Sequence, residues 1–231
     1  MARKLGVIAD VHGNALALAA VLRDADQQGI DRLVDLGDTL SGPLQPRETH
    51  HLFQQAPIVA GIRGNQDRKF FNDETLDAWL RALPPKAVVD DELFLCHGTP
   101  DSDTTYLLED ISSGLPQIRP EADILHLLNG VDQPVVLCGH THIPRVIRLS
   151  NRQMVVNPGS VGLPAYDDDQ PVKHFMETGS PHASYAILEK LSAEWNVTLR
   201  RVAYDWDAAA KLAEDDGRPD WARGLATGRM R

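Results

Sequence analysis

LGVIADVHGN (residues 5–14) begins as an apolar run and ends in an aspartate, a histidine and an asparagine. Leu5–Ala9 carries no polar side chain, which is typical of a strand that is buried on both faces. An apolar helix face follows within Asn14–Gln28, and Leu33-Val34 is a second short apolar run. The order strand, helix, strand predicts a parallel α/β unit at the start of the chain.

The rest of the chain divides into further helices and hairpins. We expect helices at Pro46–Gln55, Thr75–Leu83, Pro120–Leu128 and Asp205–Ala213, strands at Ile58–Ala60 and Pro134–Cys138, and hairpins at 87–96, 145–156 and 184–202. One domain of 231 residues is expected, with a motif-bearing core at 5–162, a loop at 163–182, and a C-terminal hairpin, helix and charged tail at 183–231.

Composition excludes several classes of protein. The formal net charge of -10 disfavours duplex nucleic acid as a partner, although a local metal cluster still permits a small anionic substrate. No run of 18 apolar residues is present, so no membrane span is predicted. Leu5–Ala9 is too short for the core of a signal peptide, and neither Cys96 nor Cys138 is expected to form a disulfide. We therefore expect a cytoplasmic protein, and the oligomeric state stays open.

Potential metal ligands follow the expected strands, directly beyond the carboxyl end of each apolar run. That edge of an open α/β sheet is where ligands bind, so we expect these side chains to converge on one site. Carboxylate, amide and imidazole donors without thiolate favour Zn, Mn, Fe, Co or Ni over Ca or Mg. One ion needs only three or four protein ligands, so the set is large enough for two ions. The candidates are Asp10, His12, Asp38, Asn65, His97, His140 and His142.

The ordered motifs D-x-H, G-D, G-N-x-D, H-G and G-H-T-H resemble those of the calcineurin-like metallophosphoesterases. The resemblance covers residues 5 to about 162, and Asn157–Gly162 is similar to a turn of the small prokaryotic phosphodiesterases in that superfamily. It implies an α/β fold, specifically a four-layer α/β/β/α sandwich with two mixed sheets. It also implies a metal-dependent hydrolase of phosphate esters, most simply a phosphodiesterase acting on a small molecule.

The resemblance further implies a role for each ligand. Asp10, His12 and His142 would hold one divalent transition ion, and Asn65, His97 and His140 a second, with Mn expected and Fe, Zn, Ni or Co as alternatives. Asp38 would bridge the two ions, between which a hydroxide would attack phosphorus in line. A protein phosphatase and a non-catalytic metal-binding scaffold remain alternative functions. Taken singly, each motif residue could also be a loop cap or a turn residue, as Asn65 could be before Asp67.

Substrate contacts are less determined by the sequence. Asn14 and Arg63 are candidates, but Asn14 also suits a helix N-cap and Arg63 a solvated or ion-paired position. The aperiodic segment 163–182 would carry His174 and His182 as a lid, or else form a surface loop without substrate contact. Gln66 stands where many members of the superfamily have a histidine thought to protonate the leaving oxygen, and an amide cannot deliver a proton.

Overall fold

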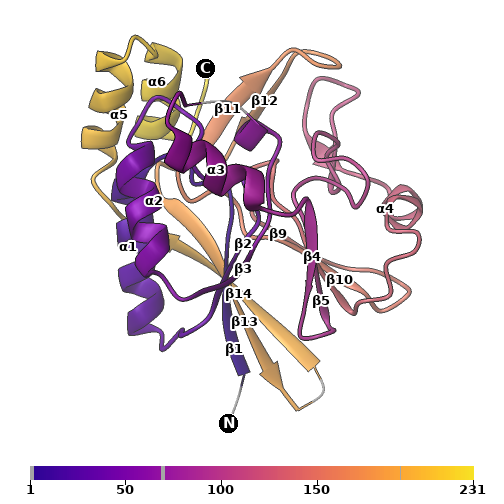
Figure 1. Ribbon diagram of the computed structural model, residues 1–231. Helices are drawn as coiled ribbons and strands as arrows, with labels where there is room; N and C mark the ends of the chain where they lie inside the picture. The colour runs from indigo at the N-terminus through magenta and orange to yellow at the C-terminus, as the bar shows by residue number, and fades with distance from the viewer. Residues whose placement is uncertain (1–2, 69–70, 193) are drawn as a thin grey trace.

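Two five-stranded sheets form the centre of the protein, seen in a computed structural model that describes residues 3–68, 71–192 and 194–231 (Figure 1). The first sheet has the order β14-β13-β1-β2-β3. Strands β1, β2 and β3 are parallel, and β13 joins β1 antiparallel. The parallel opening expected from the sequence is therefore confirmed. The strands are β1 (Arg3–Ile8), β2 (Leu33–Asp35), β3 (Ile58–Gly61), β13 (Ala183–Leu191) and β14 (Glu194–Val202).

The second sheet has the order β4-β5-β8-β10-β9 and is also mixed. Its central strands β5, β8 and β10 are parallel, while β4 and β9 pair antiparallel at the two edges. The three predicted hairpins are all present, as the pairs β4–β5, β9–β10 and β13–β14. The strands are β4 (Lys86–Val89), β5 (Leu93–Cys96), β8 (Val135–Leu137), β9 (Arg145–Arg148) and β10 (Met154–Asn157).

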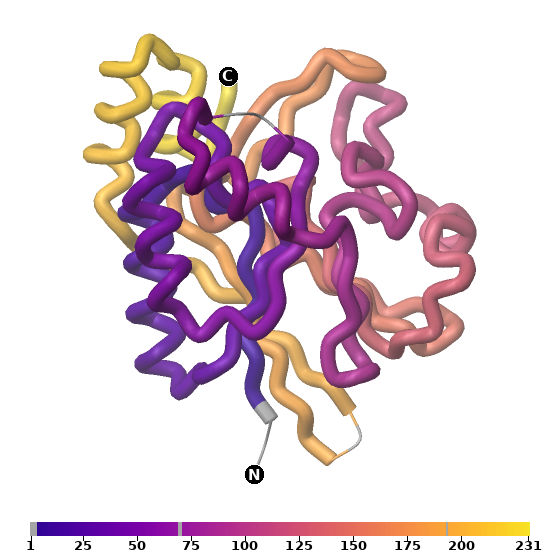
Figure 2. The backbone as a smooth tube through the Cα atoms, in the orientation of Figure 1, coloured from indigo at the N-terminus to yellow at the C-terminus, as the bar shows by residue number. Residues whose placement is uncertain are grey.

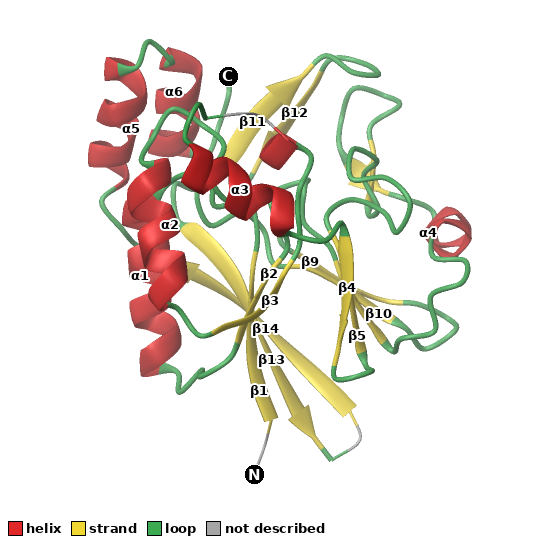
Figure 3. Ribbon diagram, in the orientation of Figure 1, coloured by secondary structure: helices red, strands yellow, loops and turns green. Residues whose placement is uncertain are grey.

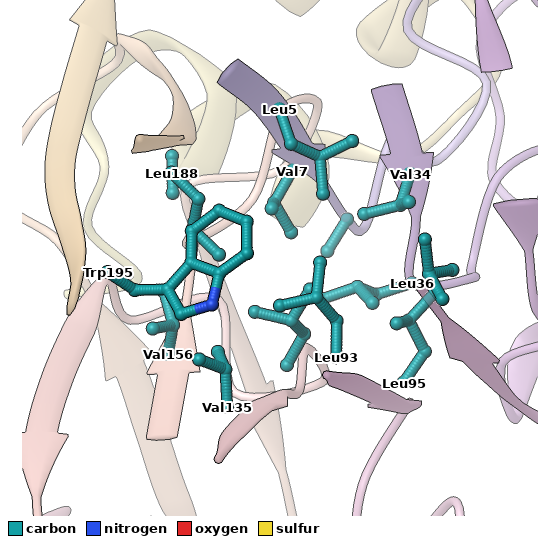
Figure 4. Close-up of a cluster of buried hydrophobic side chains, with 14 of the residues drawn as sticks. Leu5, Val7, Val34, Leu36, Leu93, Leu95, Val135, Val156, Leu188 and Trp195 are labelled. Carbon is teal, nitrogen blue, oxygen red and sulfur yellow. The ribbon is translucent and has the colours of Figure 1, made fainter. Parts of the chain in front are cut away.

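The main hydrophobic core lies between the two sheets (Figure 4). Leu5 and Val7 of β1 belong to the same cluster as Leu93 and Leu95 of β5, and Trp195 of β14 lies at one side of it. The four aliphatic side chains are at most 1% exposed. Burying each contributes roughly 1.5–3 kcal/mol, so this interface is what holds the two sheets together.

Helices cover the outer face of each sheet (Figure 3). Leu18 and Val21 of α1 pack with Ile8 of the first sheet, and Ile124 of α4 packs with Val136 of the second. The predicted α/β fold with two mixed sheets is thus confirmed, and these clusters give it the layer order α/β/β/α. The covering helices are α1 (Ala15–Gln27), α2 (Pro46–Gln55), α3 (Glu74–Ala82) and α4 (Glu121–Leu127).

The expected loop at 163–182 is instead a β-hairpin, so that prediction was wrong. Its strands are β11 (Ala165–Asp168) and β12 (His174–Glu177), paired antiparallel. Met176 and His174 are fully buried on one face of β12. Each strand has only four residues and three of the eight are charged, which hid the alternation of buried and exposed positions.

The expected charged tail was also wrong, because a second helix follows the first. The helices are α5 (Trp206–Asp215) and α6 (Pro219–Thr227), and they lie beside α1 and α2 at the C-terminal end of the trace (Figures 1 and 2). Pro219 occupies the first turn of α6, and Gly228 ends the helix with a φ of 66°. These are ordinary start and stop signals that outweigh the high charge. A two-stranded pair, β6 (Glu109–Asp110) and β7 (Gln117–Ile118), was not expected either.

The structure also bears on membrane-spanning helices and on the two cysteines. Among the described residues, no helix has both the length and the apolar character needed to cross a bilayer. Cys96 and Cys138 are buried and free, as expected.

Candidate metal centre

The candidate ligands converge where strands of both sheets end. Asp10 and His12 follow β1, and Asp38 lies just beyond β2. His97 directly follows β5 of the other sheet, yet its Nε2 lies 3.9 Å from Asp10 Oδ1 and 3.4 Å from Asp38 Oδ2. Because the core packs the sheets face to face, the carboxyl ends of their parallel strands meet at one edge.

One compact group consists of Asp10, His12 and His142. The two Nε2 atoms of His12 and His142 face each other at 3.1 Å, and His142 Nε2 lies 3.4 Å from Asp10 Oδ1. His142 Nδ1 lies 2.6 Å from the Leu163 carbonyl, which can only accept, so Nδ1 carries the proton. His142 Nε2 is thereby left as a free donor of an electron pair, as metal-ligating histidines require. His12 Nδ1 is hydrogen-bonded to Ser41 Oγ at 3.0 Å, which orients the ring, although the hydroxyl could either donate or accept.

A second compact group consists of Asp10, Asp38 and His97. His97 Nδ1 donates to the Leu36 carbonyl at 2.7 Å, which leaves Nε2 facing the carboxylates and Asn65 Oδ1, the latter at 3.0 Å. Asp38 Oδ2 also lies 4.0 Å from His12 Nε2, so Asp38 reaches both groups. Asp10 is shared by both groups as well, which the sequence reasoning did not anticipate.

His140 lies at the side of this cluster. Its ring is 5.0 Å from that of His97 and 4.7 Å from that of Tyr106, measured between ring centroids. Its backbone N–H donates to Asp10 Oδ2 at 3.1 Å. The other oxygen, Asp10 Oδ1, is buried without a hydrogen-bond donor among the described residues. A buried carboxylate oxygen of this kind requires a positive partner.

Most of these residues have left-handed backbone conformations, which are uncommon outside glycine. Such residues concentrate at functional sites, where the surrounding structure maintains an unfavourable backbone geometry. In the D-x-H and H-T-H motifs, this conformation turns both polar side chains toward the cluster. The residues and their φ values are Asp10 (54°), His12 (51°), Asp38 (55°), His140 (70°) and His142 (59°).

Asp67 holds the loop that carries Asp38. Its Oδ2 accepts the backbone N–H of Asp38 at 2.7 Å and that of Gly64 at 2.9 Å, while its Oδ1 accepts that of Thr39 at 3.0 Å. Gly64 allows this close approach, because a Cβ there would lie 2.2 Å from Asp38 Oδ1. Asp67 therefore positions the Asp38 loop. Sequence reasoning did not assign it this role, although it is the last residue of the G-N-x-D motif.

Protonation in the cluster follows from burial and close charges. Burial alone would raise the pKa of Asp38, but neighbouring histidines, His97 first, hold it below its usual range. Burial would lower the pKa of His97, but Asp38 and then Asp10 raise it to about 10. Burial and then neighbouring histidines lower the pKa values of His12 and His140 to about 4. Burial would also raise the pKa of Asp10, but His142 and His97 lower it. Near pH 7 the two carboxylates are therefore ionised and His12 and His140 neutral, as metal ligands require, whereas His97 carries a proton between the carboxylates that an ion would have to displace.

The cluster opens into a pocket with walls from separate parts of the chain. Candidate ligands and Gln66 line one side, while Tyr166, Asp167 and Asp168 come from β11. Arg218 and Trp221, at the start of α6, also line it. Sequence reasoning missed these two residues, because it treated α6 as a tail.

None of the four expected substrate contacts is among the residues that line this pocket. Asn14 is the N-cap of α1, where its side chain accepts from Ala17 N at 3.0 Å and donates to the Gly162 carbonyl at 2.9 Å. Arg63 is absent from the pocket lining, and so are His174 and His182. His174 is fully buried and bonded to the Tyr106 hydroxyl at 3.0 Å. His182 packs on the Trp206 ring, 5.1 Å between centroids.

Comparisons with known proteins agree with this fold and site. The profile of the calcineurin-like phosphoesterase superfamily domain matches residues 4–189. An uncharacterized protein of Methanocaldococcus jannaschii is 25% identical over 94% of both chains. A metallophosphoesterase crystal structure from Sphaerobacter thermophilus is 26% identical, with a TM-score of 0.73 over 99% of this chain and all of that one. A structure described as a novel archaeal phosphodiesterase shares the fold, with 17% identity and a TM-score of 0.53 over 86% of this chain and all of that one.

Fold, site and profile together define a phosphoester hydrolase of the metallophosphoesterase type. The chain belongs to the calcineurin-like phosphoesterase superfamily.

Proposed function

We propose that the protein is a dinuclear metal-dependent phosphodiesterase that acts on small molecules. The observation that carries this proposal is the buried carboxylate–imidazole cluster, in which Asp10 and Asp38 each face ring nitrogens that come from both sheets. The donor set fits divalent transition ions, because Asp10 Oδ1 has no donor among the described residues and two histidine rings are turned by carbonyl contacts to present Nε2.

Each side of the cluster would hold one ion. Asp10, His12 and His142 would bind the first, and Asn65, His97 and His140 the second, with Asp38 reaching both. Mn²⁺ is the proposed ion, and Fe, Zn, Ni and Co are alternatives that the same donors accept. When bound, such a pair polarises the phosphate oxygens and lowers the pKa of a coordinated water.

The protein's own residues position these groups. Asp67 fixes the backbone of the Asp38 loop through three N–H groups, so that the carboxylate lies between the two sets of histidines. Gln66 lines the pocket and its backbone N–H donates to Asp38 Oδ1 at 2.8 Å. An amide in this lining can donate a hydrogen bond to a leaving oxygen, but it cannot deliver a proton.

The pocket favours a small substrate over a protein. The hairpin β11–β12 and helix α6 both contribute lining residues, so the metal cluster is walled on more than one side. A protein phosphatase would need an open groove at this place. A non-catalytic scaffold has no need of seven convergent ligands, and metal content separates it from an enzyme.

The test is metal analysis combined with hydrolysis of bis(p-nitrophenyl) phosphate in the presence of Mn²⁺. We expect about two ions per chain and turnover in the unmodified protein. Asp38→Ala should lose at least one ion and nearly all activity, because one anionic ligand cannot balance two divalent ions. Asp26→Ala, at an exposed position of α1, is the matched control and should retain both. Less than half an ion per chain without rescue by Mn²⁺ would favour the scaffold, and near-normal turnover in Asp38→Ala would refute the bridging assignment.

A further inference from the structure

Helix α6 brings a positive charge to the pocket beside the candidate metal ligands. This helix lies outside the segment that the superfamily profile matches. The profile ends at residue 189, whereas α6 spans Pro219–Thr227 and Arg218 is its N-cap. Among the described residues that line the pocket, Arg218 is the only lysine or arginine. Arg63, which the sequence suggested for binding phosphate, does not line it.

The Arg218 guanidinium is held in place on two sides. Its Nε donates to Asp220 Oδ1 at 2.9 Å and its Nη2 donates to Asp220 Oδ2 at 2.5 Å. Its Cζ lies 5.3 Å from the centroid of the Trp221 ring, within cation–π range. Asp220 thus occupies one edge of the planar fork, and the N–H groups of Nη1 remain for another acceptor. The side chain is still 44% exposed, so a ligand can reach it.

Trp221 connects this arginine to the metal cluster. Its ring meets the His12 ring edge to face, with 5.6 Å between centroids. Gly42 makes room for the indole, since a Cβ at that position would lie 2.6 Å from the ring. The indole thus contacts both the ring of the candidate ligand His12 and the guanidinium of Arg218, and it links the arginine to the cluster.

We propose that Arg218 is a specificity-determining residue, which binds a second anionic group of the substrate beyond the phosphate that is hydrolysed. The chemical class is a phosphoester with an adjacent phosphate, such as an ester of a nucleoside diphosphate. This inference rests on the proposed function, since it assumes that the scissile phosphate lies at the metal cluster.

The charges of the pocket support this assignment. Asp167 is ion-paired with Lys173, and Asp168 Oδ1 accepts the backbone N–H of Gln170 at 2.9 Å. The β11 wall offers carboxylate oxygens that can accept from hydroxyl groups, whereas the α6 wall offers the remaining guanidinium N–H groups of Arg218. A substrate with phosphates on one side and a sugar on the other matches this polarity.

The experiment compares two substrates with the same leaving group, the p-nitrophenyl esters of thymidine 5′-monophosphate and thymidine 5′-diphosphate. Arg218→Ala should raise KM for the diphosphate ester by roughly 10–100-fold, the cost of one charge-assisted hydrogen-bonded contact, with a much smaller change in kcat. The loss on the diphosphate ester should exceed the loss on the monophosphate ester by at least about tenfold. Arg218→Lys should recover only part of it, because lysine lacks the planar fork that Asp220 and Trp221 hold.

Arg223→Ala is the matched control, an exposed arginine on the same helix, and should leave both substrates unaffected. An equal loss on both esters, or no loss on either, would overturn the proposal. If the unmodified protein hydrolyses neither these esters nor bis(p-nitrophenyl) phosphate, the proposed function fails by itself, and binding of ADP and AMP to the Mn²⁺-loaded protein then decides the inference. Weaker binding of ADP alone in Arg218→Ala supports the second anionic site, and unchanged ADP binding refutes it.

Discussion

At the scale of single residues, Gln66 decides whether the site can protonate the leaving group. Because an amide cannot supply a proton, and general acid catalysis is worth about 10²–10⁴-fold, we expect the rate to fall steeply as the leaving group becomes more basic. The measurement is kcat/KM for a series of phosphodiesters with graded leaving-group pKa. Gln66→His should flatten the slope, since the substitution keeps the backbone N–H that bonds Asp38.

Gln66→Asn serves as the control for that series, because it retains the amide without adding a proton donor. A flat slope in the unmodified protein would show that another group already donates the proton. Tyr166 also lines the pocket, and its hydroxyl donates to the His140 carbonyl at 2.9 Å. It would be the next residue to substitute in that case.

At the level of elements, the hairpin β11–β12 is a packed wall of the site. Its own residues His174 and Met176 in β12 are fully buried, and the hydroxyl of Tyr166 in β11 is hydrogen-bonded to that of Tyr106 at 2.9 Å. We therefore expect the paired backbone amides of β11 and β12 to exchange with deuterium slowly, in the range of the two main sheets. Hydrogen exchange followed by mass spectrometry checks this, with added phosphate as a ligand.

A mobile lid would behave differently. Its amides would exchange within seconds in the free protein and become protected when ligand binds. That result would support a lid at 163–182 and contradict the packed hairpin. The exposed residue Asp169 at the tip provides an internal reference for fast exchange.

The sequence missed this hairpin and helix α6 for a shared physical reason. Both bury a narrow face against the rest of the fold, and their other positions are charged, so apolar periodicity is weak. Ala209, Ala213 and Leu225 form a small cluster with Leu163, which no local pattern could have indicated. The apolar strands and α1 were predictable because nearly every position of these strands, and a whole face of α1, is apolar and buried.

At the scale of the molecule, the candidate metal centre draws its residues from both sheets. Its ligands follow β1, β2 and β3 of one sheet and β5 and β8 of the other. An ion present at 100 times its dissociation constant stabilises the folded state by about 2.7 kcal/mol. Each kcal/mol corresponds to roughly 2–4 °C in a chain of this length, so removing the metal with a chelator should lower Tm by roughly 5–10 °C.

Calorimetry with and without EDTA, followed by re-addition of Mn²⁺, measures this effect. Asp38→Ala should show a smaller shift, because it binds less metal. An identical Tm with and without chelator, in protein shown to contain metal, would mean that the ions do not stabilise the contact between the sheets.

Convergence of the ligands was predictable from their place after each strand, because parallel strands end at one edge. The detailed geometry was not. Left-handed φ values at Asp10 and His140, and the sharing of Asp10 between two groups, depend on tertiary contacts such as the His140 N–H bond to Asp10. The α6 wall depends on contacts between residues far apart in sequence, of which Gly42 and Trp221 are an example.

The pairing of β1 with β13 has a consequence for synthesis on the ribosome. Residues 3–7 pair with residues 186–190, so one edge of β1 stays open until the whole of the second sheet, which ends at residue 157, has been made. At about 5–20 residues per second, that interval is roughly 10–40 s. An open strand edge is a template for aggregation, so the nascent chain is exposed to wrong partners during this period. Slower translation or a shortage of chaperones should therefore reduce the yield of this protein more than that of one whose sheets form from neighbouring strands.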